Sequence, residues 1–149
     1  MTVFFDPANW VVFAATVACI GACVALHYGV LLGCAHLLPA LSRRKPPRVL
    51  LLIFIVVFTH GVEIWLFAIG YAVLCSFEVF GVIHGTAAVN SILDYAYFSG
   101  TVYSTTGFGD MVPLGAIRFM VGMEALTGLV MITWSASFTF LQMESDWPK

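Results

Sequence analysis

Three long stretches of this chain carry almost no charge, and they limit its fold more than any other feature. Residues 10–38 contain no Asp, Glu, Lys or Arg, residues 49–77 contain only Glu63, and residues 119–143 contain only Glu124. A helix needs about 20 apolar residues to cross the hydrocarbon of a bilayer. Each stretch is therefore predicted to be a membrane-spanning helix.

The overall composition agrees with this interpretation. Of the 149 residues, 61% are hydrophobic and 9% are charged. An ordinary soluble domain has about 45 to 50% apolar and about 25% charged residues. The net charge is -2, and four of the six basic residues gather in one short segment, Arg43–Arg48. These features exclude a soluble enzyme, a disordered chain and a nucleic-acid-binding protein. We expect an integral membrane protein in a lipid bilayer.

The basic segment also predicts the orientation. Positively charged loops stay on the cytoplasmic side, so Arg43–Arg48 is expected in the cytoplasm. The N-terminus and the residues that follow the second span, 78–118, are then expected outside. Three crossings return the C-terminus to the cytoplasm. Residues 1–10 lack the basic region of a signal peptide, and the first span is too long for one, so we expect it to be retained. The expected location is the cell membrane, plasma or inner.

Residues 78–118, between the second and third spans, are too apolar for a simple loop and too broken for a span. Ser91 can cap a helix over residues 91–104, and Asp94 at the third position completes a capping box. Both ends of the segment are predicted to be extracellular, so this helix would enter the membrane and return on the same side. Non-helical backbone at that depth is tolerated only where it is buried in protein or lines a watery cavity. The segment is therefore predicted to border a pore.

The segment directly after this helix, Thr105–Asp110, suits the lining of a cation pore. Glycine reaches positive φ without strain, so Gly107 and Gly109 can turn successive carbonyl groups to one side. A row of carbonyl oxygens can replace the hydration shell of a cation. The Thr105 hydroxyl adds an oxygen at the inner end, and Asp110 at the outer mouth would concentrate cations. The C-terminal end of the preceding helix favours a cation in the cavity below it.

Residues 97–118 resemble the pore loop of the potassium channel superfamily. The shared features are an aromatic pair, a pore helix, a Thr-x-Gly-(Tyr/Phe)-Gly-Asp filter, a proline three residues after the Asp, and a basic residue at the start of the inner helix. In this chain they are Tyr97 with Phe98, Thr105–Asp110, Pro113 and Arg118. With the flanking helices, the resemblance covers residues 48–142 and leaves the first span outside.

The resemblance implies a fold and an assembly. The chain would be an all-α membrane protein with three transmembrane helices plus a re-entrant pore helix and a selectivity-filter loop. Four copies would form a homotetrameric pore, because one loop cannot encircle an ion. The parts would be an N-terminal extra helix in 1–42, a cytoplasmic basic loop in 43–48 and a pore domain in 49–149. Within the pore domain, the outer helix would cover 49–77, the pore helix 91–104, the filter 105–110 and the inner helix 115–143.

The resemblance also implies the function, which is passive, selective conduction of potassium ions. Potassium would bind at Thr105, Thr106, Gly107 and Phe108, with Gly109 completing the filter and Asp110 at its outer mouth. No cofactor is expected beyond the permeant ions. Thr106 stands where Val or Ile is usual, so its hydroxyl needs a polar partner behind the filter, and Phe108 lacks the hydroxyl of the commoner Tyr. A non-selective or sodium-permeable cation channel is therefore the alternative.

The filter needs support from residues behind it. Thr101 and Val102 stand where many relatives have an acid and a Thr, so the usual acidic partner of Asp110 is missing. A buried carboxylate needs a partner, and we hypothesise that Glu124 replaces the missing acid as a brace; an exposed, pore-facing Glu124 is the alternative. Its candidate partners are Thr101, Tyr103, Ser104 and Thr106. Besides Glu124, the residues predicted to support the filter are Thr101, Tyr97 and Phe98.

Further along the inner helix, Gly128 is either a hinge or a close-packing site. Ile132, Ala136 and Phe140 recur at helical spacing and are expected to line the cavity below the filter, with Thr139 as a further candidate.

His60 and Glu63 are three residues apart and so share one face of the second span. We expect a hydrogen-bonded pair that locks the second span to the first through His27 or His36. Proton sensing by the histidines is a second hypothesis, because imidazole titrates near neutral pH. A membrane redox or metal protein would use the same four side chains, but it would not need the glycine-rich loop.

Overall fold

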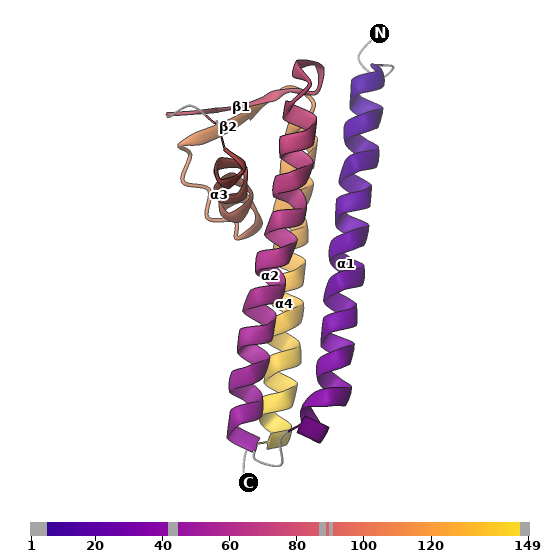
Figure 1. Ribbon diagram of the computed structural model, residues 1–149, viewed down its shortest axis with the longest axis vertical. Helices are drawn as coiled ribbons and strands as arrows, with labels where there is room; N and C mark the ends of the chain where they lie inside the picture. The colour runs from indigo at the N-terminus through magenta and orange to yellow at the C-terminus, as the bar shows by residue number, and fades with distance from the viewer. Residues whose placement is uncertain (1–5, 42–44, 87–88, 90, 147–149) are drawn as a thin grey trace.

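Three long helices dominate the structure, a computed structural model that describes residues 6–41, 45–86, 89 and 91–146. They are α1 (Pro7–Leu41), α2 (Lys45–Cys75) and α4 (Arg118–Asp146), and they run side by side along the long axis (Figure 1). Each is long and apolar enough to cross a membrane, over Pro7–Leu37, Arg48–Cys75 and Arg118–Glu144. The three predicted spans correspond to these helices.

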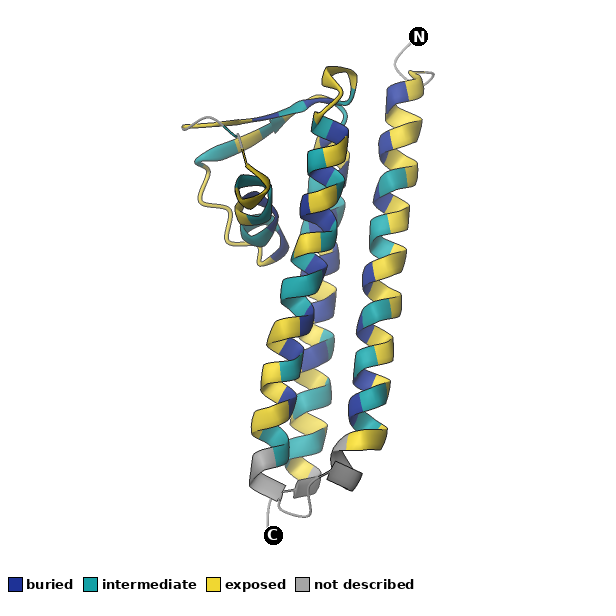
Figure 2. Ribbon diagram, in the orientation of Figure 1, coloured by how far each residue is buried: buried dark blue, intermediate teal, exposed yellow. Residues whose placement is uncertain are grey.

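The outward faces of these helices stay apolar. Large side chains such as Trp10, Phe58 and Phe140 are exposed on α1, α2 and α4 in turn, and exposed and buried residues alternate along each helix (Figure 2). A helix that is apolar all round is typical of a membrane span rather than of a water-facing helix. The outward residues are therefore suited to lipid or to neighbouring chains.

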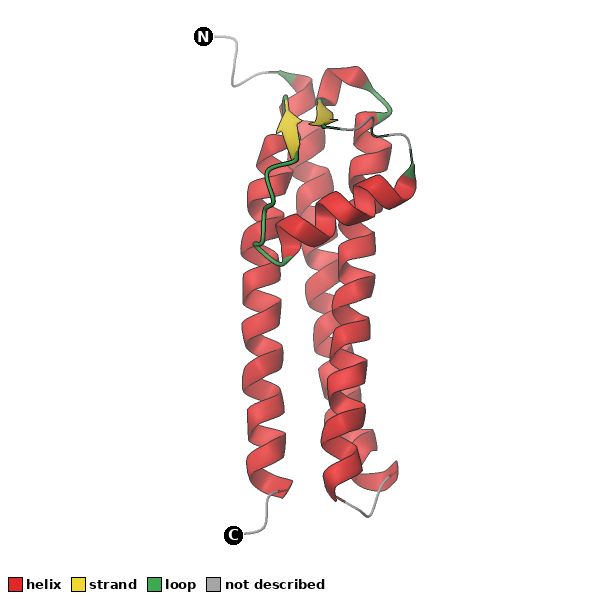
Figure 3. Ribbon diagram, turned by 90° about the vertical axis from the view of Figure 1, so that its left-hand side faces the viewer, coloured by secondary structure: helices red, strands yellow, loops and turns green. Residues whose placement is uncertain are grey.

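Helix α1 packs against both α2 and α4, on the opposite side of that pair from the short helix α3 (Ile92–Tyr103) (Figure 1). Helix α3 lies across the same half of the bundle as the two strands described below (Figure 3). The buried core lies where the four helices meet and is built largely of aromatic and other apolar side chains. Its fully buried members include Val12, Phe67, Tyr71, Ile117 and Met120.

The start of α3 is as predicted. Ser91 is the N-cap, its side-chain oxygen accepts a hydrogen bond from the backbone N–H of Asp94 at 3.3 Å, and the Asp94 carboxylate accepts one from the Ser91 N–H at 2.8 Å. This reciprocal pair is the capping box, and it satisfies two N–H groups that a helix start leaves free. The helix covers 92–103, against the predicted 91–104.

The expectation of an all-α protein is wrong at one place. Strands β1 (Val82–Gly85) and β2 (Met111–Leu114) pair antiparallel, with Val82 opposite Leu114 and Gly85 opposite Met111. A four-residue strand inside an apolar run has too few positions to reveal a period of two, so the pattern does not separate it from loop or helix. The two strands bracket α3 and Thr105–Asp110 in the chain and bring the ends of that segment together.

Two glycines close the base of this strand pair. A Cβ on Gly115, which has φ of 84°, would lie 2.7 Å from the Gly81 Cα, so neither position has room for a side chain. Positive φ at Gly115 also delays the last helix, which begins at Arg118 rather than at the predicted 115. Helix α2 begins earlier than the predicted 49, because Pro46 and Pro47 fall in its first turn, where no helical N–H is needed.

Candidate functional site

The segment Thr105–Asp110 has a regular backbone alternation. Thr105, Gly107 and Gly109 have φ of 58°, 50° and 78°, whereas Thr106 and Phe108 have none of the positive values. Residues at positive φ that alternate with ordinary residues can turn successive carbonyl groups to one side of the chain. The segment therefore has the backbone alternation from which a row of carbonyl oxygens can be built.

The two glycines are required for conformation rather than for space. A Cβ on Gly107 or Gly109 would have no atom within 4 Å, so positive φ alone disfavours larger residues there. Thr105 adopts the same region without being glycine, which costs a residue of this kind about 1–3 kcal/mol. The sequence pattern had indicated positive φ at the two glycines but not at Thr105, which was predicted only as an oxygen donor to the ion. Strained residues of this kind cluster at functional sites.

The inner end of this segment is held by the last turn of α3. The N–H of Thr105 donates to the Val102 carbonyl at 2.9 Å, and the N–H of Gly107 donates to the Thr101 carbonyl at 3.0 Å. The hydroxyls of Thr106 and Ser104 are hydrogen-bonded at 2.8 Å, so Thr106 has the polar partner that the sequence led us to expect. Thr101 supports the segment through its backbone, since its own hydroxyl donates to Phe98.

The outer end is held by Tyr97. Its hydroxyl donates to the Asp110 carboxylate at 2.8 Å, and its ring stacks on Phe108 with centroids 6.5 Å apart and an interplanar angle of 8°. This bond to a carboxylate raises the pKa of Tyr97 above its usual value. Tyr97 thus gives Asp110 a hydrogen-bond partner where no acidic side chain is present for that role. The neighbouring Phe98 is buried in the core, edge-on to the Tyr71 ring.

Glu124 on α4 is completely buried, so the alternative of an exposed, pore-facing Glu124 is wrong. Its carboxylate accepts hydrogen bonds from Ser99 on α3 and from Tyr71 on α2. It therefore joins three helices. Neither partner was among the four hydroxyl residues predicted, because Thr101 and Ser104 donate to carbonyls of their own helix instead.

Gly128 allows α4 to contact the end of α3. A Cβ at this position would overlap the backbone carbonyl of Tyr103, so any larger residue would push the two helices apart. The packing explanation of this glycine is thereby confirmed, and a hinge at Gly128 stays a prediction.

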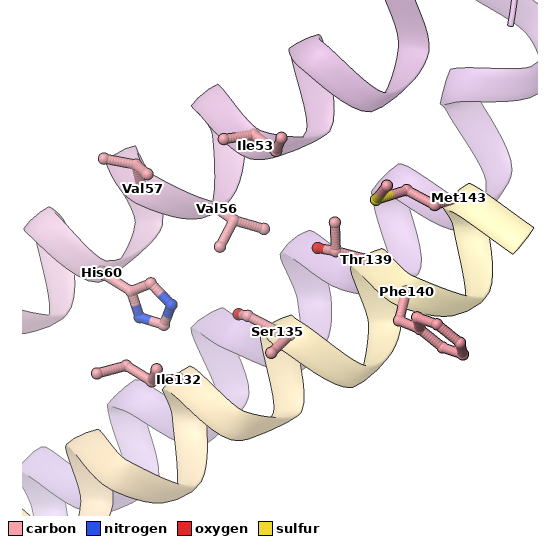
Figure 4. Close-up of a pocket in the computed structure, with 10 residues that line it drawn as sticks. Ile53, Val56, Val57, His60, Ile132, Ser135, Thr139, Phe140 and Met143 are labelled. Carbon is pink, nitrogen blue, oxygen red and sulfur yellow. The ribbon is translucent and has the colours of Figure 1, made fainter. Parts of the chain in front are cut away.

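The residues predicted to line a cavity meet on one face of α4. Ile132, Ala136, Thr139 and Phe140 border an open groove of about 370 Å³ between α2 and α4 (Figure 4). Ile53, Val56, Val57 and His60 line it from α2, and Ser135 and Met143 complete it from α4. The groove is largely apolar, and the His60 ring points into it (Figure 4).

A second buried polar group, besides the one around Glu124, joins all four helices. We call it the Glu63 cluster, and it consists of His27, His60, Glu63, Tyr103 and Ser135. The Glu63 carboxylate bonds His27 Nδ1 at 2.9 Å and His60 Nδ1 at 3.0 Å, and it accepts a hydrogen bond from the Tyr103 hydroxyl. His60 Nδ1 lies 2.9 Å from the same hydroxyl, and Ser135 bonds His27 Nε2 at 3.1 Å. The predicted lock between the first two spans is confirmed with His27.

His36, the other candidate, is exposed. Tyr103 and Ser135 were missed by the sequence pattern, because a hydroxyl on an apolar helix does not indicate which distant residue it meets. His27, His60 and Glu63 could also hold a metal ion, since their ligand atoms all lie within 4.8 Å of one another. Within the described residues, however, every buried side-chain nitrogen and oxygen already has a hydrogen-bond partner.

The sequence of this chain matches the sequence model of a known protein family. The sequence model of a family described as ion channel matches residues 48–144, about two thirds of the chain. The match includes α3, the glycine-rich segment and nearly all of α2 and α4, and it leaves α1 outside. A comparison with curated proteins and with solved structures finds no match to the chain. By the extent of the family match, the chain belongs to the ion channel family.

Proposed function

We propose that four copies of this chain form a pore that conducts potassium ions passively and selectively across a membrane. The observation that carries the proposal is the alternation of φ at Thr105, Gly107 and Gly109. A row of carbonyl oxygens facing a common axis can replace the water around a desolvated cation. The ion channel family to which the chain belongs supports conduction as its activity.

In this arrangement each subunit contributes one wall of a selectivity filter. Potassium binds at Thr105, Thr106, Gly107 and Phe108, and the Thr105 hydroxyl adds the innermost oxygen. Gly109 completes the filter, and Asp110 lies at the outer mouth. Residues 104–109 are exposed in a single chain, which fits a segment that faces an axis shared with other copies.

The assembly sits in the cell membrane with α3 as a re-entrant pore helix. The basic segment Arg43–Arg48 faces the cytoplasm, as does the C-terminus, and the N-terminus and the strand pair face outside. In this orientation Asp110 meets the external solution. The groove residues Ile132, Ala136 and Phe140 lie on the cytoplasmic side of the filter.

Selectivity depends on how firmly the filter is held. The bonds of Thr106 to Ser104 and of Gly107 to Thr101 brace the inner end, which supports selection of potassium. The alternative, a non-selective or sodium-permeable pore, is suggested by Thr106 in place of an apolar residue. Both functions use the same segment and differ in one measurable ratio.

The test is ion flux in liposomes that contain the purified chain, driven by a potassium gradient or by a sodium gradient. We expect potassium flux and little sodium flux. Equal flux of both ions would establish the non-selective alternative, and flux of neither would overturn the proposal.

Two glycine variants make the test specific to the filter. Gly107→Ala places a side chain at positive φ and should abolish potassium selectivity. Gly29→Ala adds the same methyl group to a helical, exposed position on α1 where a Cβ has no neighbour within 4 Å, and it should behave like the wild type. Wild-type selectivity in Gly107→Ala would show that Gly107 does not form the filter.

A further inference from the structure

We propose that α1 is a working part of the pore: His27, acting through Glu63, positions Tyr103 and so fixes the inner end of the filter. This inference rests on the proposed function. It also gives a role to α1, which lies outside the family match because the match begins at residue 48.

The contacts run in an unbroken line from α1 to α3. His27 bonds one oxygen of the Glu63 carboxylate at 2.9 Å, and the other oxygen accepts a hydrogen bond from the Tyr103 hydroxyl. All three side chains are buried, with exposed fractions of 1%, 0% and 1%. Water therefore does not replace a lost partner easily, and a hydrogen bond to a charged group is stronger than one between neutral groups.

The line continues from Tyr103 to the filter through backbone. Tyr103 is the last residue of α3, and its carbonyl is pressed against Gly128 of α4. The two residues before it, Thr101 and Val102, supply the carbonyls that accept the N–H groups of Gly107 and Thr105. A shift of Tyr103 would therefore move both acceptors on which the inner end of the filter depends.

Electrostatics makes His27 more than a filler of space. A carboxylate in a membrane interior is costly unless donors surround it. The groups that face Glu63 are His27 from α1, His60 from α2 and Tyr103 from α3, while Ser135 of α4 reaches it only through His27. When His27 is removed, one carboxylate oxygen loses its donor, and Glu63 must turn toward the remaining two or take up a proton. Either response alters its bond to Tyr103.

The distances favour hydrogen bonding over a shared metal ion in this cluster. The nitrogens of His27 and His60 lie 2.9 and 3.0 Å from carboxylate oxygens. Two ligands at a tetrahedral angle on zinc stand about 3.3 Å apart. The spacing of the cluster is therefore that of hydrogen-bond donors and acceptors rather than that of ligands on a shared metal ion.

The experiment is the potassium to sodium permeability ratio of the full chain in planar bilayers, for variants at both ends of the line. His27→Ala removes the donor to Glu63, and Tyr103→Phe removes one hydroxyl while keeping the ring. We expect each variant to lower the ratio by about tenfold or more, the scale set by loss of a buried charged hydrogen bond. Because both act through Glu63, the double variant should be no worse than the worse single variant.

Two control variants separate positioning from a general loss of structure. His27→Asn keeps a polar atom near the place of the Nδ1 and should restore the ratio to within about twofold of the wild type. His36→Ala changes an exposed histidine of the same helix and should leave the ratio unchanged.

Several outcomes would overturn the inference. The first is a wild-type ratio in Tyr103→Phe, a variant that opens no cavity and tests the link even where His27→Ala fails to assemble. The second is a double variant whose fold-loss in the ratio is the product of the two single fold-losses. A wild-type ratio that responds to a chelator or to added zinc, with the response lost in His27→Asn, would assign the cluster to a metal instead. A wild type without potassium preference would refute the proposed function itself.

Discussion

At the scale of single residues, the structure places two carboxylates inside an apolar helical bundle and surrounds each with donors. Glu124 has Ser99 and Tyr71, and Glu63 has two histidines and Tyr103. Burying a carboxylate costs several kcal/mol unless such partners are present. The bonds also cross between helices, so each carboxylate fixes how its neighbours sit against one another. Intramembrane acids in this setting are candidates for a functional role.

Glu124→Gln tests the brace that Glu124 is proposed to form. The amide keeps the shape but offers one acceptor oxygen to two hydroxyl donors, so the buried Tyr71 hydroxyl loses its acceptor, whereas Ser99 also bonds the Ile64 carbonyl at 2.8 Å. We expect the assembly to lose roughly 1–3 kcal/mol of stability. Thermal unfolding in detergent measures this loss, and potassium selectivity measured in parallel should fall.

Tyr71→Phe supplies the matched control for that prediction. It removes the hydroxyl that Glu124→Gln leaves without an acceptor, so its cost should be smaller in the Glu124→Gln background than in the wild type. Selectivity and open probability that are unchanged in Glu124→Gln would mean that Glu124 supports the bundle but not the filter.

At the scale of elements, the helices could be predicted and their contacts could not. Charge-free stretches and a capping box are local patterns, so the three long helices and the start of α3 follow from the sequence. Strands β1 and β2 were missed because each is only four residues long. Residues 99 and 124, or 63 and 103, become partners only through packing, and a single sequence carries no record of it. The glycine-rich segment could be recognised because the residues that give it its chemistry are consecutive in the sequence.

Helix α3 gives a prediction at this scale. Ser91→Ala removes the side-chain half of the capping box and should destabilise the first turn of α3 by about 1 kcal/mol, whereas Ser91→Asn should cost only a few tenths. Hydrogen exchange of the α3 amides compares the two variants directly. Equal protection in both would indicate that packing against α2 and α4, rather than the cap, sets the stability of this helix.

At the scale of the whole molecule, the proposed assembly turns single features into rings. One Asp110 is a half-buried acid tied to Tyr97, but four of them around an axis would form a concentrated negative charge at the pore entrance. Similarly, four copies of α1 on the side of the bundle away from α3 would surround the pore without lining it (Figure 1). The line from His27 to Tyr103 is what would let such a peripheral helix influence conduction.

The ring of Asp110 predicts a conductance that depends on ionic strength. Asp110→Asn should lower potassium conductance several-fold at about 0.01 M salt, where the Debye length is about 30 Å, and should have little effect at about 1 M, where it is about 3 Å. Single-channel recording across that range measures the difference. Glu78→Gln removes the same charge from an exposed position before β1, off the proposed axis, and should change conductance little at any concentration.

Tyr97→Phe separates the charge of Asp110 from its structural bond. This variant frees the carboxylate but leaves its charge, so it should preserve the dependence of conductance on salt while weakening the outer end of the filter. If instead Asp110→Asn reduced conductance by the same fraction at every salt concentration, and Tyr97→Phe reproduced that reduction, Asp110 would act as a strut for the filter. The ring of charge would then have no part in attracting ions, because salt screens an electrostatic effect, and such an effect would weaken as the salt concentration rises.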